Sequence, residues 1–327
     1  MTVPSKIAPS ESVTSAPWYP IARELSDGLL ACSGDSVRVV LLYGSHLLAV
    51  NRDRHSAFDF VVIVDDYTRF YRALRQSGEL DRWVWIMAGL SRVLPPNVIA
   101  FAPSDGVNGI AKCLIVSRSD FERALGSRPK DHFLLGRLVQ KVGLVCTRSA
   151  EDGAWVERVL ARARSRVLDW MAPYLREPID GAALGRRLLE VCYQGEFRPE
   201  AVNRAESIFR AQEDHFQAAF DGVLARAASE GTMIEDGGAY RLAHPAPESV
   251  ARRWRWHFRR SKVRATARWF KHIVTFDKWL PYVVRKAERH SGTKIELTPL
   301  ERRWPLLFLW PRVIRYLRNR PPKEISR

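Results

Sequence analysis

Cysteine is scarce in this sequence, and long apolar runs are missing. The 327 residues include four cysteines, none of them in a C-x-x-C pair, which argues against a disulfide framework and against a zinc site of paired thiolates. No apolar stretch approaches the roughly eighteen residues of a transmembrane helix. The first twenty residues contain no arginine and no long apolar segment, so neither an import presequence nor a secretory signal is expected. These absences favour a protein of the reducing cytoplasm.

Positive charge is distributed unevenly along the chain. Residues 251–327 contain 22 Lys or Arg and five Asp or Glu, whereas the first 250 residues contain 30 and 31, so the net charge of +16 arises in the last quarter. That quarter also holds six of the eleven tryptophans. A basic, tryptophan-rich segment indicates an anionic partner, either lipid headgroups or nucleic acid.

The alternation of apolar runs and turn residues predicts an α+β protein in four parts. We expect a flexible arm over 1–20, a mixed sheet with helices over 21–148, a helical unit over 149–250, and a basic helical tail over 251–327. Strands are expected at Val37–Tyr43, Phe58–Val64, Val98–Ala102 and Ile110–Val116. Helices are expected at 21–31, Asp66–Gln76, Asp81–Arg92, Ser119–Leu125 with Ser119 as its cap, Trp155–Leu175, 180–193, 199–209 and 210–229.

The end of the helical unit carries a hairpin signal. Asp236-Gly237-Gly238 separates two short runs within 232–242, which is typical of a tight turn between two strands. Helices followed by a hairpin resemble a winged-helix unit, and a plain helical linker domain is the alternative. In the tail, the helical pattern is interrupted at four prolines: Pro281, Pro299, Pro305 and Pro311.

The first chemical motif is a glycine–serine turn followed by a carboxylate on the next strand. Tyr43, Gly44 and Ser45 end one expected strand, and Asp59 lies inside the next. Glycine lets the backbone approach a triphosphate, and a helix that begins here supplies N–H donors. A strand carboxylate can hold Mg²⁺, which offsets phosphate charge. Because an isolated carboxylate in an apolar strand is costly, we predict that Asp59 is a metal ligand.

The sequence identifies a second metal ligand less directly. The spacing resembles that of the nucleotidyltransferase superfamily, whose members usually place two carboxylates at i and i+2, but the residue two before Asp59 is Ala57. Asp65 lies six residues after Asp59 and shares its face if the strand continues, while Asp66 begins the next helix. Asp65 or Asp66 is therefore the candidate second ligand, and the alternative is that the pair only caps that helix.

Lys112 lies inside an apolar run, where a lysine needs an anionic partner. One interpretation is that its partner is a triphosphate. The other is that Lys112 sits on an edge strand and discourages aggregation. The sequence leaves both open.

Together these motifs resemble those of the mitochondrial-type CTP:phosphatidate cytidylyltransferases, the translocator assembly and maintenance family, over about residues 38–290. The resemblance is carried by Tyr43-Gly44-Ser45, Phe58-Asp59-Phe60-Val61, Val64-Asp65-Asp66, Lys112 in its strand, Gly136-Arg137-Leu138 with Gln140-Lys141, Tyr193-Gln194-Gly195-Glu196-Phe197-Arg198, and Ser261-Lys262 with Thr266, Lys271 and Lys278. The family also lacks the first strand carboxylate. The chain departs from the family at His46, where the family has glycine, and across residues 70–85. We expect His46 to pack, and we expect a bacterial relative because no presequence is visible.

The resemblance implies a nucleotidyltransferase-fold enzyme that forms CDP-diacylglycerol and pyrophosphate from CTP and phosphatidic acid, with Mg²⁺ as cofactor. It implies catalytic roles for Asp59, Asp65 and Lys112, with Asp66 as a further candidate metal ligand. The implied nucleotide-binding residues are Tyr43, Gly44, Ser45, Ser56 and Lys112. The implied lipid-phosphate residues are Arg137, Arg198 and Lys262.

The end of the tail has the composition of a membrane-surface segment. Trp304 and Trp310 bracket an apolar run, and Arg312 and Arg315 follow it. Such a segment can lie among anionic headgroups, and the alternative is a terminal helix packed on its own protein. We expect peripheral attachment to the inner face of the cell membrane, with nucleic acid a less expected partner. The other hypotheses are a nucleotidyltransferase acting on RNA or protein, and a catalytically degenerate adaptor for membrane or nucleic acid.

Overall fold

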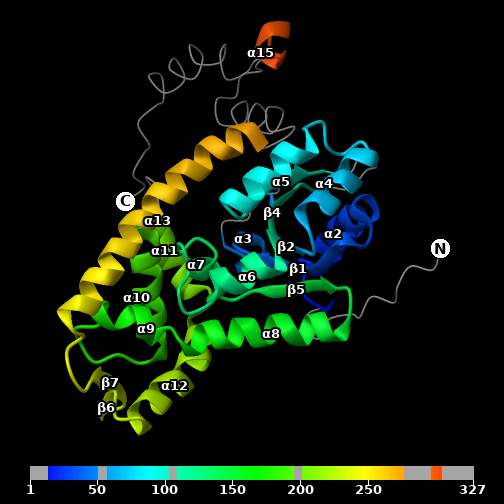
Figure 1. Ribbon diagram of the computed structural model, residues 1–327. Coiled ribbons are helices and arrows are strands. Elements are labelled where there is room, and N and C mark those ends of the chain that lie inside the picture. Colours follow the sequence, from blue (N-terminus) through cyan, green and yellow to red (C-terminus); the bar gives the residue numbers. More distant parts are fainter. Residues whose placement is uncertain (1–13, 51–56, 103–108, 195–200, 276–295, 304–327) are drawn as a thin grey trace. The chain divides into compact units, whose positions relative to one another are not determined.

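The structure is a computed structural model that describes residues 14–50, 57–102, 109–194, 201–275 and 296–303 (Figure 1). The described residues up to Thr275 belong to one compact unit, and the residues after it belong to a second. A five-stranded mixed sheet surrounded by helices makes the fold α+β, as the sequence predicts.

The first half of the chain supplies the sheet and the helices around it. The strands are β1 (Val37–Tyr43), β2 (Phe58–Val64), β3 (Asn97–Phe101), β4 (Ala111–Ser117) and β5 (Gly143–Thr147). The helices around them are α2 (Tyr19–Ser33), the 3-10 turn η1 (Gly34–Ser36), α3 (Ser45–Leu48), α4 (Tyr67–Gln76), α5 (Val84–Val93), α6 (Arg118–Ala124), α7 (Leu135–Leu138) and α8 (Ala150–Ser165).

The second half is mainly helical. Its elements are α9 (Leu168–Met171), the 3-10 turn η2 (Ala172–Tyr174), α10 (Gly181–Gln194), α11 (Ala201–Arg210), α12 (Glu213–Ser229), the hairpin strands β6 (Met233–Asp236) and β7 (Ala239–Leu242), and α13 (Glu248–Thr275). The second unit contributes α15 (Pro299–Arg303).

The central sheet has the strand order β3-β4-β2-β1-β5. Strands β2 and β4 are parallel, and the other neighbouring pairs are antiparallel. Because β1 runs opposite to β2, its C-terminal end lies beside the N-terminal ends of β2 and β4. One end of the sheet therefore gathers the turn after β1 and the first residues of β2 and β4.

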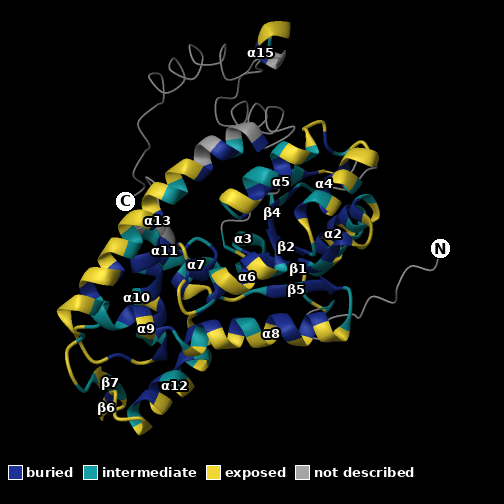
Figure 2. Cartoon of the chain, viewed as in Figure 1, coloured by how far each residue is buried: buried dark blue, intermediate teal, exposed yellow. Residues whose placement is uncertain are grey.

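Both faces of the sheet are covered, which explains why its strands are almost continuously apolar. Phe60 and Val62 belong to a core shared with α2, α4 and α5, while Val61 and Ile63 alternate with them and face the side where α6 and α8 pack. The ribbon shows α8 running along the sheet on the side away from α4 and α5 (Figure 1). The strands are dark blue, that is buried, over most of their length (Figure 2).

The helical half ends in the hairpin that the sequence predicts. Gly237 and Gly238 form its two-residue turn with φ values of 59° and 86°, the left-handed conformation that such turns require. A β-bridge joins Tyr240 of β7 to Ile179, just before α10. Helices followed by a hairpin are thus confirmed, while the winged-helix interpretation stays a prediction.

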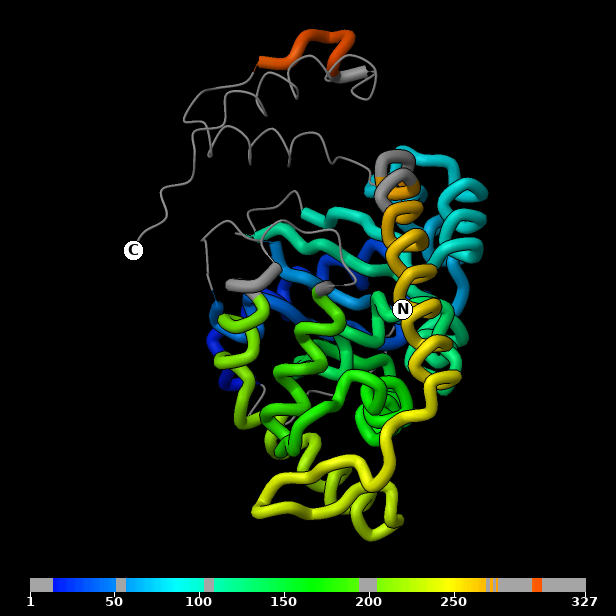
Figure 3. The backbone as a smooth tube through the Cα atoms, turned by 90° about the vertical axis from the view of Figure 1, so that its left-hand side faces the viewer, coloured from blue at the N-terminus to red at the C-terminus, as the bar shows by residue number. Residues whose placement is uncertain are grey.

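Helix α13 begins before residue 251, the expected start of the tail, and continues past it. It runs for 28 residues and lies beside the sheet in two perpendicular views (Figures 1 and 3). Its Ser261 hydroxyl accepts a hydrogen bond of 3.1 Å from the His132 N–H, and Lys271 donates to carbonyl groups just before β3. Residues 251–275 therefore belong to the compact unit, whereas the sequence places the start of the tail at residue 251.

Three expected helix boundaries also differ. The Ser117 hydroxyl accepts a hydrogen bond from the Asp120 N–H, so Ser117 rather than Ser119 caps α6. The single helix expected over 155–175 is divided into α8, α9 and η2. Pro299 does not simply interrupt a helix but begins α15, where Thr298 and Glu301 bond reciprocally as a capping box.

Candidate functional site

The candidate site lies at the end of the sheet where β1 ends and where β2 and β4 begin. Tyr43 is the cross-strand partner of Asp59, and Asp59 is the partner of Lys112 on the parallel strand. Asp59 and Lys112 are both partly exposed members of otherwise buried strands. The structure thus brings together three residues that the sequence assigns to nucleotide or metal binding.

Gly44 adopts a conformation that its position beside Asp59 requires. It has φ 81° and ψ −154°, a combination that residues with a side chain rarely adopt. A Cβ atom added there would lie only 3.0 Å from Asp59 Oδ2. The turn therefore lets the backbone approach the Asp59 carboxylate closely.

Replacing Gly44 with alanine is expected to lower the free energy of unfolding by about 1–2 kcal/mol because of the strained φ. The added methyl group also displaces the Asp59 carboxylate. Urea denaturation measures the loss of stability. Gly89→Ala in α5 is the control, because a Cβ there meets no atom within 4 Å. Equal behaviour of the two variants would contradict the close approach.

The position of Lys112 excludes one of its two interpretations. Strand β4 lies between β3 and β2, so Lys112 is not on an edge strand and the aggregation interpretation is wrong. Its Nζ lies 3.9 Å from Asp59 Oδ1, and 42% of its side chain is exposed. A pair this long and this exposed contributes less than about 1 kcal/mol. The Asp59 pair by itself therefore does little to fix the ammonium group in place.

His46 packs, as expected. Its ring is stacked on that of Phe58, with centroids 3.8 Å apart and planes at 11°. The stack fixes α3, which follows the Gly44 turn, against the first residue of β2.

Asp65 does not lie with Asp59. It follows the last residue of β2, about 20 Å along the strand from Asp59, and its carboxylate pairs with Arg38 and, at 2.7 Å, with Arg148. Arg38 also pairs with Asp152 at 2.7 Å. The structure therefore does not bring Asp65 to Asp59, and it places Asp65 in an ion-pair network at the far end of the strand.

Asp66 caps a helix, which was the alternative interpretation. Its side chain accepts a 3.0 Å hydrogen bond from the N–H of Arg69 in the first turn of α4. It also pairs with Arg92 at 3.0 Å. The backbone N–H and the guanidinium of these two residues hold the pKa of Asp66 below its usual value although burial opposes this. The structure therefore places Asp66 at the start of α4 and not beside Asp59.

A metal ion at this site has few protein ligands available. The described ranges contain no group of three or more His, Cys, Asp or Glu side chains placed to hold one. Mg²⁺ often uses one or two carboxylates, with substrate phosphates and water completing its coordination. Asp59 fits that pattern as the single carboxylate, provided that a nucleotide supplies the phosphates.

The expected lipid-phosphate residues are only partly placed. The Arg137 guanidinium lies over the Phe133 ring at 3.9 Å and donates to the Phe133 carbonyl. Lys262 is exposed on α13. Six predicted residues lie outside the described part of the chain: the nucleotide-binding candidate Ser56, the lipid-phosphate candidate Arg198, and the membrane candidates Trp304, Trp310, Arg312 and Arg315. In the ranges that are described, no helix has both the length and the apolarity to cross a membrane.

Sequence reasoning missed a buried ion-pair cluster between α13 and the segment before α7. Asp131 Oδ2 accepts from Arg264 Nε at 2.8 Å and from Arg268 Nη2 at 2.5 Å. Burial opposes ionisation of Asp131, but Arg268 and Arg264 outweigh it and hold its pKa below the usual value. Arg268 also donates through Nε and Nη2 to the Pro95 carbonyl. No local pattern could have revealed these contacts, which join residues more than 130 positions apart.

Lys271 and His272 end this row on α13. Lys271 Nζ donates to the Leu94 and Pro96 carbonyls at 2.5 and 2.7 Å. Burial, followed by the charges of Lys271 and Lys112, lowers the pKa of His272 to about 3. The contacts of α13 with β3 place the end of this helix beside the sheet.

The stability of the protein is expected to rise between pH 7 and about pH 10 through Lys271. Burial, with the charges of Arg268 and Arg264, lowers its pKa to about 7, whereas an unfolded lysine titrates near 10.4. In that interval the unfolded chain binds a proton that the folded chain does not, so the free energy of unfolding increases with pH, by at most about 1.4 kcal/mol per unit. Denaturation at several pH values should show this slope in the wild type and a flatter one in Lys271→Met. Identical slopes would contradict it.

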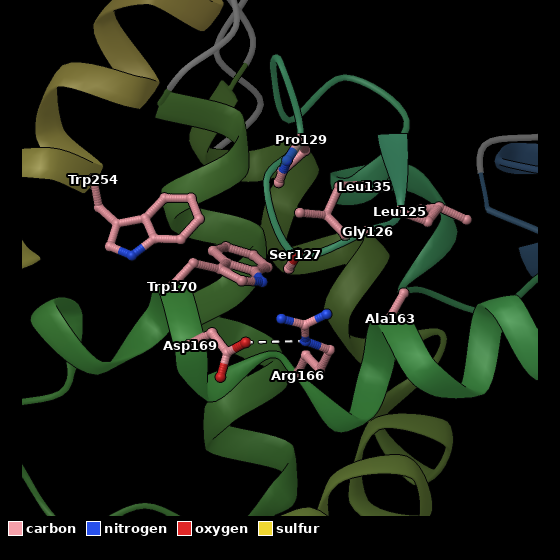
Figure 4. Close-up of a pocket in the computed structure, with 10 residues that line it drawn as sticks. All are labelled: Leu125, Gly126, Ser127, Pro129, Leu135, Ala163, Arg166, Asp169, Trp170 and Trp254. Carbon is pink, nitrogen blue, oxygen red and sulfur yellow. Dashed lines mark hydrogen bonds and ion pairs between the residues drawn. The ribbon is translucent and has the colours of Figure 1, made fainter. Parts of the chain in front are cut away.

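A small pocket lies elsewhere, between α8, α9, the segment after α6 and α13 (Figure 4). Trp170 and Trp254 form one wall, and Arg166 Nε pairs with Asp169 at 3.1 Å. The other lining residues are Leu125, Gly126, Ser127, Pro129, Leu135 and Ala163. None of the residues predicted for nucleotide or metal binding lines it.

Comparison with known proteins identifies no relative: no protein-family model matches the chain, and no curated protein matches it significantly. What the site can do is therefore judged from its own residues.

Proposed function

We propose that the chain is a Mg²⁺-dependent nucleotidyltransferase with a nucleotidyltransferase fold, and that it forms CDP-diacylglycerol from CTP and phosphatidic acid. The observation that carries the proposal is the approach of Gly44, Asp59 and Lys112 at one end of the sheet. The choice of CTP and phosphatidic acid comes from the resemblance of the sequence motifs.

Each of these residues has a part in the proposed reaction. The Gly44–Ser45 turn brings backbone close to the CTP phosphates, and Lys112 places a positive charge beside them. Asp59 would hold Mg²⁺, which when bound supplies positive charge to the phosphates. A phosphate oxygen of phosphatidic acid attacks the α-phosphorus of CTP, the new O–P bond forms, and the bond to the β-phosphate oxygen breaks so that pyrophosphate leaves. A phosphate monoester, with a second pKa near ~6, is already largely anionic at neutral pH, so positioning matters more than a general base.

The surface of α13 supports an anionic membrane as the place of reaction. Arg252, Trp256, Arg259 and Val263 follow the i, i+4, i+7, i+11 spacing of one helix face, and all are exposed. The side chains of Trp256 and Val263 are among the most exposed large apolar ones in the described ranges. Basic residues attract anionic headgroups, and tryptophan is suited to their interface.

The test is conversion of labelled CTP, with phosphatidic acid liposomes and Mg²⁺, into a chloroform-extractable product that disappears when EDTA is added. Pyrophosphate release without a lipid product would retain the transferase and point to an RNA or protein acceptor. Absence of product and of pyrophosphate release from any nucleotide would reject the enzyme and favour an adaptor.

Deleting residues 301–327 is expected to abolish liposome pelleting while activity on detergent-dispersed phosphatidic acid is kept. The reason is that this segment holds the arginines and tryptophans assigned to the membrane and none of the residues assigned to nucleotide or metal binding. Pelleting with anionic and with neutral liposomes measures the first effect. Undiminished pelleting of the shortened protein would assign membrane attachment to another surface, such as that of α13.

A further inference from the structure

Positive charge exceeds negative charge in the buried cluster on α13. We define the arginine cluster as Arg137, Arg264 and Arg268 together with Asp131. Both Arg137 and Arg268 lie over the Phe133 ring, at 3.9 and 4.7 Å, and Arg264 and Arg268 share the single Asp131 oxygen. The Asp131 carboxylate is thus shared by two guanidinium groups, and the Lys271 ammonium adjoins them through the carbonyls around Pro95.

Two donors of the cluster are buried and make no hydrogen bond in the part of the chain that the structure describes. They are Arg268 Nη1 and Arg264 Nη2. The Arg268 side chain is only 3% exposed, so water cannot compensate for its charge as it does at a surface. Leaving a charged donor buried without an acceptor is one of the more costly arrangements in a folded protein.

We propose that the arginine cluster binds a phosphate-type oxyanion, with Arg268 Nη1 and Arg264 Nη2 donating to its oxygens. This site is separate from Asp59, and it stands whether or not the chain transfers nucleotides.

Phosphate matches both the charge and the geometry of the cluster. A phosphate group offers several acceptor oxygens and up to two negative charges, and the planar guanidinium fork is suited to binding it through paired N–H groups. A water molecule could satisfy the donors but would leave the excess charge. The Pro95 carbonyl already accepts from Arg268 Nε and Nη2, so the acceptor for Nη1 has to come from elsewhere.

Access to the cluster is through Arg264. Its side chain is 23% exposed, against 3% for Arg268. An anion can therefore approach along Arg264 and reach Arg268 behind it.

Inorganic phosphate is the first probe, titrated into the full-length protein at constant ionic strength with chloride as the balance. We expect saturating phosphate to raise the Tm of the wild type by about 5 °C and Arg264→Gln to weaken the apparent affinity at least about tenfold. Arg226→Gln, on the exposed end of α12, is the matched control. No response in the wild type, or an equal response in Arg264→Gln, overturns the proposal.

A second variant keeps the test decisive if Arg264→Gln folds poorly. Asp131→Asn removes the only negative charge of the cluster, so its Tm without phosphate should fall while its affinity for phosphate should rise. If water filled the cluster instead, affinity would not rise, and the proposal would be rejected.

The source of the phosphate group is assigned by comparing glycerol 3-phosphate with a soluble short-chain phosphatidic acid. Both carry the same phosphomonoester. Tighter binding of the lipid, lost in Arg264→Gln, identifies a lipid headgroup, and equal binding identifies a free phosphate ester. Binding of both that is insensitive to Arg264→Gln contradicts the site.

Discussion

Asp59→Ala lowers nucleotide turnover by about a thousandfold or more and leaves the fold intact. The expected loss is that of a group acting directly on the charge of the reacting phosphates. Its structural cost is small, because the only ion pair that Asp59 makes in the described ranges is the 3.9 Å contact with Lys112, which is partly exposed. Conversion of labelled CTP measures turnover, and thermal unfolding measures the fold. Wild-type turnover by Asp59→Ala would end the assignment of the site.

Asp65→Asn is the matched control, and it should lower stability while leaving turnover nearly unchanged. Asp65 pairs with Arg38 and Arg148, so removing its charge leaves two partly buried guanidinium groups with less compensation. We expect a loss of about 1–3 kcal/mol in the free energy of unfolding, with turnover per folded molecule close to that of the wild type. A collapse of turnover in Asp65→Asn at unchanged stability would return Asp65 to the metal site.

Gly185→Ala is expected to destabilise the protein by about 3 kcal/mol or more. A Cβ atom at position 185 of α10 would lie 2.2 Å from Cγ of Phe216, which is fully buried in the first turns of α12. Phe216 is itself held between Phe209 and Phe220, with ring centroids 6.3 and 5.8 Å away. The helices must therefore separate to admit one methyl group. Chemical denaturation measures the loss.

Replacing Gly222 with alanine should change the free energy of unfolding in the opposite direction. Gly222 is a helical residue of α12, and a Cβ there meets no atom within 4 Å. Alanine then brings only its better helix propensity, so the free energy of unfolding should rise by about 0.5–1 kcal/mol. Equal changes at the two glycines would show that helix propensity, not the contact of α10 with α12, decides the effect.

The strands could be predicted because their apolar runs are short, continuous and bounded by turn residues. Val37–Tyr43 and Phe58–Val64 are predicted and observed with identical bounds. The strand β5 was missed, because Gly143–Thr147 contains a glycine and a cysteine and follows the polar pair Gln140-Lys141. Its pairing with β1 is set by the sheet, a tertiary effect that overrides weak local preference.

Site residues could be placed from the sequence where their surroundings are set by the strand that carries them. Asp59 was placed correctly beside the Gly44 turn because the two belong to neighbouring strands joined by a short connection. Asp65 was misplaced because the period of two gives the face of a side chain but not its position along the strand. Six residues of strand separate it from Asp59, so a shared face did not bring the carboxylates together.

The sequence did not reveal the position of α13, because that position depends on contacts between residues far apart in the chain. The expectation of a separate tail from residue 251 rested on charge, which reports the surface of a helix. It does not report that Arg264, Arg268 and Lys271 on the same helix are turned inward toward Asp131 and the Pro95 region. A helix that is basic on several faces carries no local signal of which cations are buried.

The docking of α13 also affects the order in which the chain can fold during synthesis. Lys271 meets the Leu94 carbonyl 177 residues earlier in the chain, and at a typical elongation rate of about 5–20 residues per second that interval lasts on the order of ten seconds or more. Until then Asp131 has neither of its arginine partners, and the side of the sheet beside β3 lacks its last helix. A nascent chain is therefore exposed to non-native pairing there, and a ribosome-bound chain ending before residue 264 should recruit chaperones that a chain extending past residue 275 releases.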